Sequence, residues 1–484
     1  MRRQAGRIGG IGLAALVLAA PALAQTAPPP APAPAAAQAP IRTLAEALAA
    51  AYATNPTLLA ARANLRAIDE GVPAALAGWR PTISVSTSAG YADDTRLTHT
   101  TATTPPSNSV SRIHRGLNTE SITATQPLYR GGATRAGTNR AENQVMAERG
   151  RLIAQEQTTF VAVTQAFVGV IQANQVLGLN VNNEQVLTRQ LQATNDRFRV
   201  GEITRTDVAQ AEAALAGAVA TRQTAEGSLQ TARATYRNLV NVLPGTLIEP
   251  QPLRLPTRTL EQGQALALTN NPSVVAALFD DAAAKDNFDL QYARLMPTVS
   301  LQAQISRGED STLKNLQVTT SQVTAVLNVP LYQGGIEYAA IRQARQQQQQ
   351  TRQKLADARN NAVQLVTSAW ATYGAAKAAI DSTRQQVKAN EIALEGVQRE
   401  ALVGSRTTLD VLNAEQTLLN SRVQLIGNLA AVVNASYQVA SAMGRLTARE
   451  LGLKVPLYDE TAYYKAVRDR WIGTSDYATD QPGR

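Results

Sequence analysis

Few residues of this 484-residue chain have the types and spacing that catalysis needs. The two histidines, His99 and His114, both lie in a polar, Thr/Ser-rich stretch, residues 92–116, which is typical of an exposed loop. The sequence has no metalloprotease, phosphate-loop or serine-hydrolase motif. It also has no cysteine, which excludes a disulfide framework and a thiolate metal site. We therefore expect no enzyme activity, no cofactor and no bound metal.

Two acidic residues are distinctive by their position. Asp207 and Asp410 each follow a threonine by three residues, Thr204 and Thr407. This spacing is that of a capping box, in which an acid in the first helical turn accepts backbone hydrogen bonds and meets the positive end of the helix dipole. Asp410 lies 203 residues after Asp207, and the equal surroundings indicate an internal duplication.

The duplication organises the whole chain. The segment PLYRGG at 127–132 recurs as PLYQGG at 330–335, and the turn glycine Gly201 recurs as Gly404, all 203 residues apart. Upstream, the Thr43-Leu44 and Asn55-Pro56 pairs recur 216 residues later. Proline has no N–H to donate, and paired glycines permit a sharp change of direction. We expect strand-to-helix joints at Pro127, Gly131 and Gly132, and at Pro330, Gly334 and Gly335.

Each repeat is predicted to run helix, strand, strand, long helix, turn and return helix. The first, residues 43–250, should have strands at about 81–91 and 117–129, a long helix at about 133–200 and a return helix at about 206–242. The second, residues 251–446, should have strands at about 297–306 and 317–331, a long helix at about 336–403 and a return helix at about 408–443. We expect Gly71-Val72-Pro73 to bend the first helical segment.

The two ends of the chain differ from the repeats. Residues 1–24 resemble a secretory signal, with three early arginines, a short apolar core and an Ala-Leu-Ala cleavage site. Residues 25–42 are Ala/Pro-rich and are predicted to be a disordered leader. Residues 447–484 form a Tyr-rich tail, predicted to be irregular, whose Tyr463, Tyr464 and Trp471 should pack back on the helices.

The predicted strands alternate between apolar and polar residues, so each should have one apolar and one polar face. A water-facing sheet on a soluble core has the same pattern, but about ten residues also suffice to cross a bilayer when the strand is tilted. Four strands cannot close a barrel, and lipid does not tolerate open sheet edges. If these strands lie in a membrane, several chains must share one barrel.

The long helices, about 100 Å each at 1.5 Å per residue, contain no proline. Val366, Tyr373 and Ile380 begin a seven-residue apolar repeat in the second one, which is typical of coiled-coil packing. The net charge of +9 comes from arginines interleaved with acids along these helices, without a set of stacking aromatics. We therefore expect a solvated helix surface and no nucleic-acid partner.

The duplication, the paired joints and the two turns, in this order and spacing from about Thr43 to Leu446, resemble the TolC family of outer-membrane export ducts. The resemblance implies a mixed α and β membrane protein. It would be a homotrimer, with four antiparallel strands per chain in a shared twelve-stranded outer-membrane barrel and long helices forming a periplasmic tunnel. It also implies drug efflux or type I protein secretion, with a periplasmic adaptor and an inner-membrane ABC or RND-type pump as partners.

The resemblance also assigns residues at the helix turns. Asp410 matches the first of two acids that ring the pore and attract cations, whereas Asn413 replaces the second. Arg406 and Asp207 match a pair that ties the tips together and holds the tunnel shut. A tyrosine of that lock is Ala401 here, so the lock should be looser or built differently. Helix capping is the alternative role for both aspartates.

Two other functions fit parts of the pattern: a periplasmic coiled-coil adaptor, and a scaffold protein without a barrel. Adaptors have a single helical hairpin, so the 203-residue repeat argues against the first. The sequence does not identify the cargo, the pump, the adaptor or the resting state of the tips.

Overall fold

The computed structural model describes residues 41–100, 102, 105, 107–311 and 313–474. The predicted signal peptide and the leader up to Pro40 lie outside the described residues. The leader prediction is wrong at its last two positions. Ile41 is only 5% exposed within the core, and the carbonyl of Arg42 accepts a hydrogen bond from Ile248 N at 2.9 Å.

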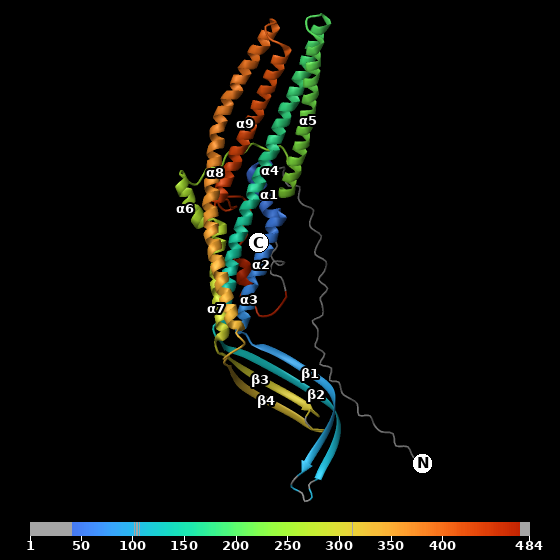
Figure 1. The fold of residues 1–484 in the computed structure, drawn as a ribbon, viewed down its shortest axis with the longest axis vertical. Coiled ribbons are helices and arrows are strands. Elements are labelled where there is room, and N and C mark those ends of the chain that lie inside the picture. The colour runs from blue at the N-terminus through green and yellow to red at the C-terminus, as the bar shows by residue number, and fades with distance from the viewer. Residues whose placement is uncertain (1–40, 101, 103–104, 106, 312, 475–484) are drawn as a thin grey trace, which may run out of the picture. The chain divides into compact units, whose positions relative to one another are not determined.

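The first repeat begins with short helices, α1 (Leu44–Thr54), α2 (Pro56–Asp69), α3 (Gly71–Leu76) and the 3-10 turn η1 (Ala77–Trp79). Strands β1 (Thr82–Thr100) and β2 (Ser107–Arg130) follow. The long helix α4 (Ala133–Arg199) and the return helix α5 (Arg205–Val240) complete it. In Figure 1 the four strands lie together at one end of the described chain and the tips of the long helices at the other.

The second repeat has the same order. Helices α6 (Leu260–Asn270) and α7 (Pro272–Tyr292) and the turn η2 (Ala293–Leu295) precede β3 (Thr298–Glu309) and β4 (Gln317–Asn328). Helices α8 (Ile336–Leu402) and α9 (Thr408–Ala442) follow. The long and return helices of both repeats end within a few residues of the predicted bounds.

The two repeats differ where the first short helices end. In the first repeat Glu70 separates α2 from α3, at the bend predicted from Gly71 and Pro73. A proline inside a helix causes such a break because it removes a backbone hydrogen bond and clashes with the preceding turn. In the second repeat α7 runs unbroken through the equivalent positions, which are Asn287 and Asp289.

The same polar contact recurs in both repeats. Asn55 and Asn271 cap α2 and α7 with their side-chain oxygens. The Asn55 amide donates to the carbonyl of Leu239 at 3.0 Å, and the Asn271 amide donates to that of Ala442 at 3.0 Å. Each asparagine thus ties the start of one helix to the end of its own return helix.

The strands form one antiparallel sheet in the order β1-β2-β3-β4. The register places Val85 opposite Ile122, and Ile122 opposite Ile305, on one apolar face. On the other face Ser86 bonds Ser121 at 2.7 Å and Gln304 bonds Gln322 at 3.0 Å. The predicted alternation is therefore present, with a side-chain hydrogen-bond network on the polar face.

The first hairpin is much longer than predicted. Most of residues 92–116, predicted to be a loop, belong to β1 and β2, which pair from Thr82↔Thr125 to Thr100↔Ser107. The two histidines therefore lie in strands, and His114 Nδ1 lies 3.1 Å from Asp93. The loop prediction is wrong because serine and threonine are common in loops, but β-branched threonine also favours strands. The shorter second repeat forms a shorter hairpin.

The two joints differ as well. β4 ends at Asn328, before Pro330, as expected from the missing N–H of proline, so the predicted strand end at 331 is wrong. β2 instead passes through Pro127 to Arg130 with a bulge between Pro127 and Tyr129. Beyond Thr125, β2 pairs only with β3, and a bulge accommodates a residue that cannot donate. The paired glycines have positive φ in both joints, at Gly131, Gly132, Gly334 and Gly335.

The main core lies around the middle of α4. Phe160, Val163 and Phe167 are fully buried there, and the rings of Tyr52 and Tyr236 lie 6.2 and 6.3 Å from those of Phe160 and Phe167. By length and composition α4 is apolar enough to cross a membrane. Phe160, Val163 and Phe167 in its middle are core residues, however, so we assign α4 to the helical part of the protein.

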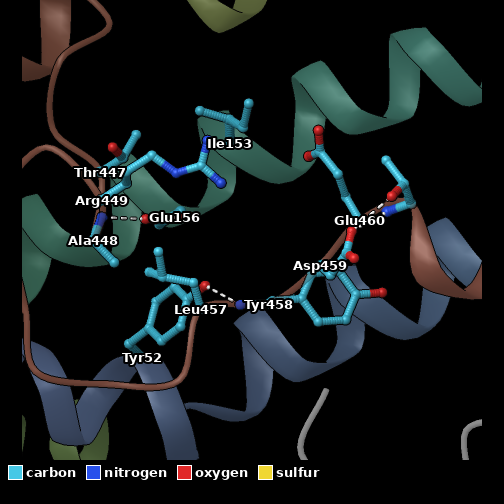
Figure 2. A pocket seen from close by; sticks show the side chains of 11 residues that line it. Tyr52, Ile153, Glu156, Thr447, Ala448, Arg449, Leu457, Tyr458, Asp459 and Glu460 are labelled. Carbon is cyan, nitrogen blue, oxygen red and sulfur yellow. Dashed lines mark hydrogen bonds between the residues drawn. The ribbon is translucent and has the colours of Figure 1, made fainter.

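The C-terminal tail lies along α1, α2 and α4 (Figure 2). Ala448 N donates to Glu156 at 2.6 Å, and Tyr458 N donates to the Tyr52 hydroxyl at 3.0 Å. A cavity of about 450 Å³ between tail and helices is lined by charged residues of both. The prediction of an irregular tail misses one helix, α10 (Ala462–Val467). Tyr464 packs on the core as expected, whereas Trp471 is 65% exposed.

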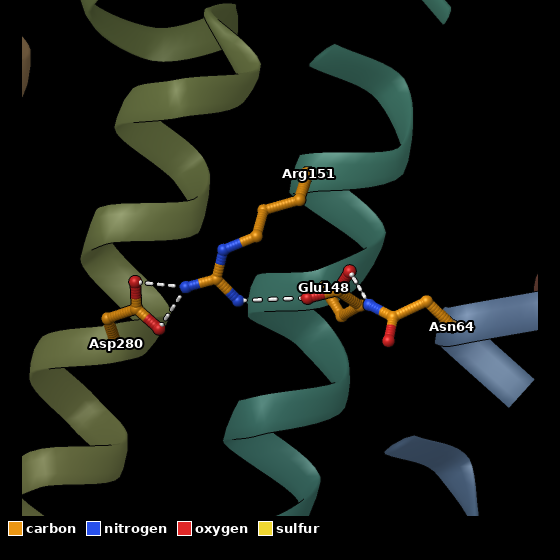
Figure 3. Close-up of polar contacts among 4 residues, drawn as sticks. All are labelled: Asn64, Glu148, Arg151 and Asp280. Carbon is orange, nitrogen blue, oxygen red and sulfur yellow. Dashed lines mark hydrogen bonds and ion pairs between the residues drawn. The ribbon is translucent and has the colours of Figure 1, made fainter. Parts of the chain in front are cut away.

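A polar cluster around the buried Glu148 joins the two repeats (Figure 3). Arg151 of α4 donates two hydrogen bonds to Asp280 of α7, at 2.6 and 2.8 Å, and one to Glu148 at 3.0 Å. Asn64 of α2 donates to the other oxygen of Glu148 at 2.6 Å. The buried Glu148 carboxylate is therefore paired on both sides, and one arginine links α7 to α4.

Candidate functional site

The two turns at the far end of the long helices have the same backbone structure. Gly201 and Gly404 have φ of 80° and 79°, which only glycine adopts without strain. In each turn the glycine N–H bonds three residues back, and the next N–H bonds five residues back, to Arg197 and Glu400. This is the usual way to end a helix on a left-handed residue. The sequence therefore folds into two matched hairpin tips.

Both aspartates of the tips cap their own helices. Asp207 accepts from Thr204 N at 3.0 Å and from its hydroxyl at 2.7 Å. Asp410 accepts from Thr407 N at 2.9 Å and from its hydroxyl at 2.8 Å. The capping role considered from the sequence is thus present for both residues. It leaves one oxygen of each carboxylate available to other groups.

The tip charges are organised within each tip. Arg406 Nε lies 2.9 Å from Glu400, and Arg197 lies 2.6 Å from Glu202. Within the chain, Arg406 and Asp207 are therefore not brought together, and their pairing stays a prediction. Sequence reasoning missed Glu400, although an acid four residues before the tip glycine Gly404 is visible in the sequence.

Hydrogen bonds keep the tip acids ionised. The backbone N–H and hydroxyl of Thr407 lower the pKa of Asp410, and the positive charge of Arg406 adds to the effect. The hydroxyl and backbone of Thr204 lower the pKa of Asp207 in the same way. Glu400 raises the pKa of Arg406. Both carboxylates therefore carry full negative charge at neutral pH.

The second tip has one acid where the resemblance implied two, because Asn413 lies one turn after Asp410 with its side chain exposed. Ala401, in place of the lock tyrosine, only accepts the N–H of Gly404 through its carbonyl, at 3.2 Å. The second tip thus carries Asp410 as its capping acid and Arg406 paired with Glu400.

The tips also expose apolar residues that sequence reasoning did not single out. Leu402 and Val403 are 84% and 80% exposed, and Phe198 and Val200 project from the first tip. Such residues at the free end of a hairpin suit contact with another helical protein. Among the described residues, no group of three His, Asp or Glu side chains is arranged to hold a metal.

Comparison with known proteins identifies the family. The model of the outer membrane efflux protein family matches residues 47–242 and 265–445, which is most of both repeats. The outer membrane efflux protein BepC of Brucella suis is 35% identical over 432 residues, covering 89% of this chain and 91% of BepC. The outer membrane protein TolC of Escherichia coli is 26% identical over 326 residues, covering 61% of this chain and 63% of TolC.

A crystal structure of CusC has the same fold. The two structures superpose with a TM-score of 0.73 at 17% identity, covering 83% of this chain and 92% of that of CusC. The match of the family model to both repeats decides against the adaptor and scaffold functions. The sheet is the outer-membrane part of a TolC-like export duct and the helices are its periplasmic part. This chain belongs to the outer membrane efflux protein family.

Proposed function

We propose that three copies of this chain share one outer-membrane barrel and one periplasmic helical tunnel. The duct would be passive, with no enzymatic chemistry of its own. It would open when a periplasmic adaptor and an inner-membrane pump of the ABC or RND type engage the tips. Drugs or secreted proteins would pass through it, and the pump would select the cargo.

The sheet edges are the observation that carries this proposal. Among the described residues, β1 pairs only with β2, and β4 pairs only with β3, so both strands have an unpaired side. Unpaired backbone groups in lipid each cost several kcal/mol, about the cost of an unmade hydrogen bond in hydrocarbon. Pairing of β4 with β1 of the next copy satisfies them and closes a barrel.

The tips supply the gate of the proposed duct. Three copies of Asp410 around the pore axis would form one ring of charge that attracts cations. Arg406 would hold the closed state through a contact with Asp207. That contact would form either within one chain, with Arg406 released from Glu400, or between Arg406 of one copy and Asp207 of the next. The exposed Leu402 and Val403 would contact the adaptor.

Cysteine cross-linking tests the shared barrel, because the natural chain contains no cysteine. One cysteine is placed at Ser86 of β1 and a second is scanned over Thr320, Gln322 and Thr324 of β4. Since these strands lie at opposite edges of one sheet, a disulfide between them must join two copies. We expect dimer and trimer bands, and no larger band, from the full-length protein in outer membranes.

The matched control uses neighbouring strands. Cysteines at Ser86 and Ser121, whose hydroxyls lie 2.7 Å apart, should link within one chain and leave a monomer band. If every β4 position gives monomers only, while the control pair oxidises, the shared barrel is wrong. Bands larger than a trimer would contradict the proposed number of copies.

A further inference from the structure

We propose that the end of the C-terminal tail is a second membrane contact, in which Trp471 and Ile472 insert among the headgroups of the periplasmic leaflet. The partner is the glycerophospholipid surface itself. The proposal rests on the location of the strands in the outer membrane. It adds a lipid-binding segment that lies outside the sheet and outside both repeats.

The tail is held firmly along the helices that lead to the sheet. The Tyr463 hydroxyl donates to Glu70 at 2.8 Å, at the break between α2 and α3. Arg468 and the Tyr464 hydroxyl both donate to Glu142 of α4 at 3.3 Å. Val467 is 1% exposed against these helices. The path of the tail is therefore fixed up to its last turn.

The last contact places the end of the tail beside the first strand. Arg80 Nη1 donates to the carbonyl of Arg470 at 2.6 Å, and its guanidinium carbon lies 5.0 Å from the centre of the Trp471 ring. Arg80 is only two residues before Thr82, where β1 begins. Because the strands start at the membrane boundary, Trp471 lies at the depth of that boundary.

The side chains at this depth are apolar and open. Trp471 is 65% exposed and Ile472 is 87% exposed, and the neighbouring Trp79 is 45% exposed. Large aromatic side chains near the other junctions of strand and helix are also exposed, namely Tyr129, Tyr292, Tyr332 and Tyr338. Tryptophan and tyrosine concentrate where membranes meet water, since their rings favour the apolar side and their polar atoms favour water.

The charge of the tail favours a lipid surface over a second protein copy. Residues 462–474, around Trp471, carry Lys465, Arg468 and Arg470 against one acid, Asp469, and the last ten residues of the chain add Asp476, Asp480 and Arg484. Basic residues beside an apolar insert are attracted to anionic headgroups. A second copy of this chain, itself net positive at +9, lacks that complementarity.

The three tryptophans of the chain make a direct test possible, because Trp79 and Trp471 are exposed beside the start of β1, whereas Trp370 lies in the long helix α8. Full-length proteins that keep one tryptophan each, with phenylalanine at the other two positions, are reconstituted in phosphatidylethanolamine/phosphatidylglycerol vesicles. A fraction of the lipids is brominated either near the headgroup or near the chain end. Bromine quenches tryptophan only on close contact, so the quenching reports lipid contact and its depth.

We expect quenching of Trp471 comparable to that of Trp79, several-fold stronger than that of Trp370, and greater with bromine near the headgroup. Trp370 of α8 is the matched control, because it lies in the helical part. Quenching of Trp79 without quenching of Trp471 would overturn the proposal and leave the barrel intact. A blue-shifted, unquenched Trp471 would mean that another protein surface covers it.

A second measurement avoids the multiple substitutions. In the otherwise native chain, Trp471→Phe should reduce the fraction of fluorescence that headgroup-brominated lipid quenches. An unchanged quenched fraction would contradict the proposal. Lack of any quenching in the native chain would mean that the protein is not inserted, which is a failure of the outer-membrane assignment and not of the tail contact alone.

Discussion

The two long helices have the same length and equivalent places in the repeats, but they are buried very differently. Helix α4 has twenty buried residues among its 67, whereas α8 has seven among its 67. Helix α4 contacts α1, α2, α3, α5, α7 and α9, whereas α8 contacts α6, α7 and α9. The first repeat therefore builds the core of the chain, and the second leaves most of a long helix uncovered.

This difference shows how one duplicated unit acquires two tasks. In the first repeat the short helices and the tail pack on α4 around Phe160 and Phe167. At the position equivalent to Phe167, α8 has Trp370, which is only partly buried against a small cluster. Surface left free on α8 is available to neighbouring copies in the proposed tunnel. The repeats are thus alike in backbone and different in what their helices contact.

The largest effect is expected from core substitutions in α4. Phe167→Ala should lower the free energy of unfolding by about 3–5 kcal/mol, because it leaves a cavity in the main core. Trp370→Ala should lower the free energy of unfolding of the dissociated chain by less than Phe167→Ala does. Its main effect should be to weaken the assembly of copies. Denaturant unfolding followed by helical circular dichroism measures the first effect, and heat resistance of the assembly measures the second. Equal unfolding costs for the two variants would contradict the comparison.

A smaller difference in stability is expected between substitutions at the two strand-to-helix joints. Gly131 and Gly334 are equivalent glycines with φ of 62° and 68°, so alanine at either position should cost about 1–2 kcal/mol in backbone strain. An added Cβ at Gly131 would also lie 2.7 Å from the carbonyl of Ala293, whereas at Gly334 nothing lies within 4 Å. Gly131→Ala should therefore lower the thermal midpoint more than Gly334→Ala. The reverse order would mean that the first joint is loosely packed.

A pH effect should distinguish the first repeat from the second. Asp69 is fully buried without a hydrogen-bond partner among the described residues, and burial raises its pKa to about 7, against the lowering effect of Arg149. The folded chain then keeps this proton up to about pH 7, whereas the unfolded chain loses it near pH 4. Stability should therefore fall as pH rises from about 4 to about 7.

Asp69→Asn should remove that slope and raise stability at pH 8 by about 1–3 kcal/mol, with little change below pH 4. The control is Lys285→Gln, since Lys285 is the exposed residue at the equivalent position of the second repeat. Thermal unfolding across this pH range measures both. If the stability of Asp69→Asn still falls between about pH 4 and about pH 7, groups other than Asp69 cause the pH dependence.

The smallest change is expected at the tips, where the two capping aspartates form a matched pair. Asp410→Asn and Asp207→Asn perturb equivalent capping boxes, so their effects on stability should be equal within about 0.5 kcal/mol. Only Asp410→Asn should reduce cation selectivity, measured as the reversal potential in a salt gradient. Equal shifts for both variants would remove the special role of Asp410.

Much of this structure could be predicted from the sequence, because its helices and strands follow periodic patterns and their ends are marked by proline, glycine or capping residues. The absence of proline, the tip glycines and the threonine caps set the ends of the long helices, and Gly71-Val72-Pro73 marks the break after α2. These are local signals, which act through the backbone of a few residues. The contacts of α4, by contrast, depend on which distant helices meet, and short-range patterns carry no such information.

The errors have the same origin. The long hairpin was missed because Thr/Ser-rich segments favour strands only when a partner strand is present, as β1 and β2 are for each other. The bulge at Pro127 depends on where β1 stops, and the pairing of Arg406 with Glu400 depends on a side-chain conformer of the tip. The prediction that Trp471 packs on the helices is wrong, because the sequence of an irregular tail does not show whether an aromatic side chain is covered or exposed.

Single-channel conductance of the purified full-length protein in a planar bilayer tests the central claim most directly. The account predicts discrete, small, cation-selective openings that divalent cations block from the side of the helix tips. Arg406→Ala should raise that conductance, since it removes the cation proposed to hold the tips closed. Protein that stays monomeric and produces no openings would contradict the shared duct.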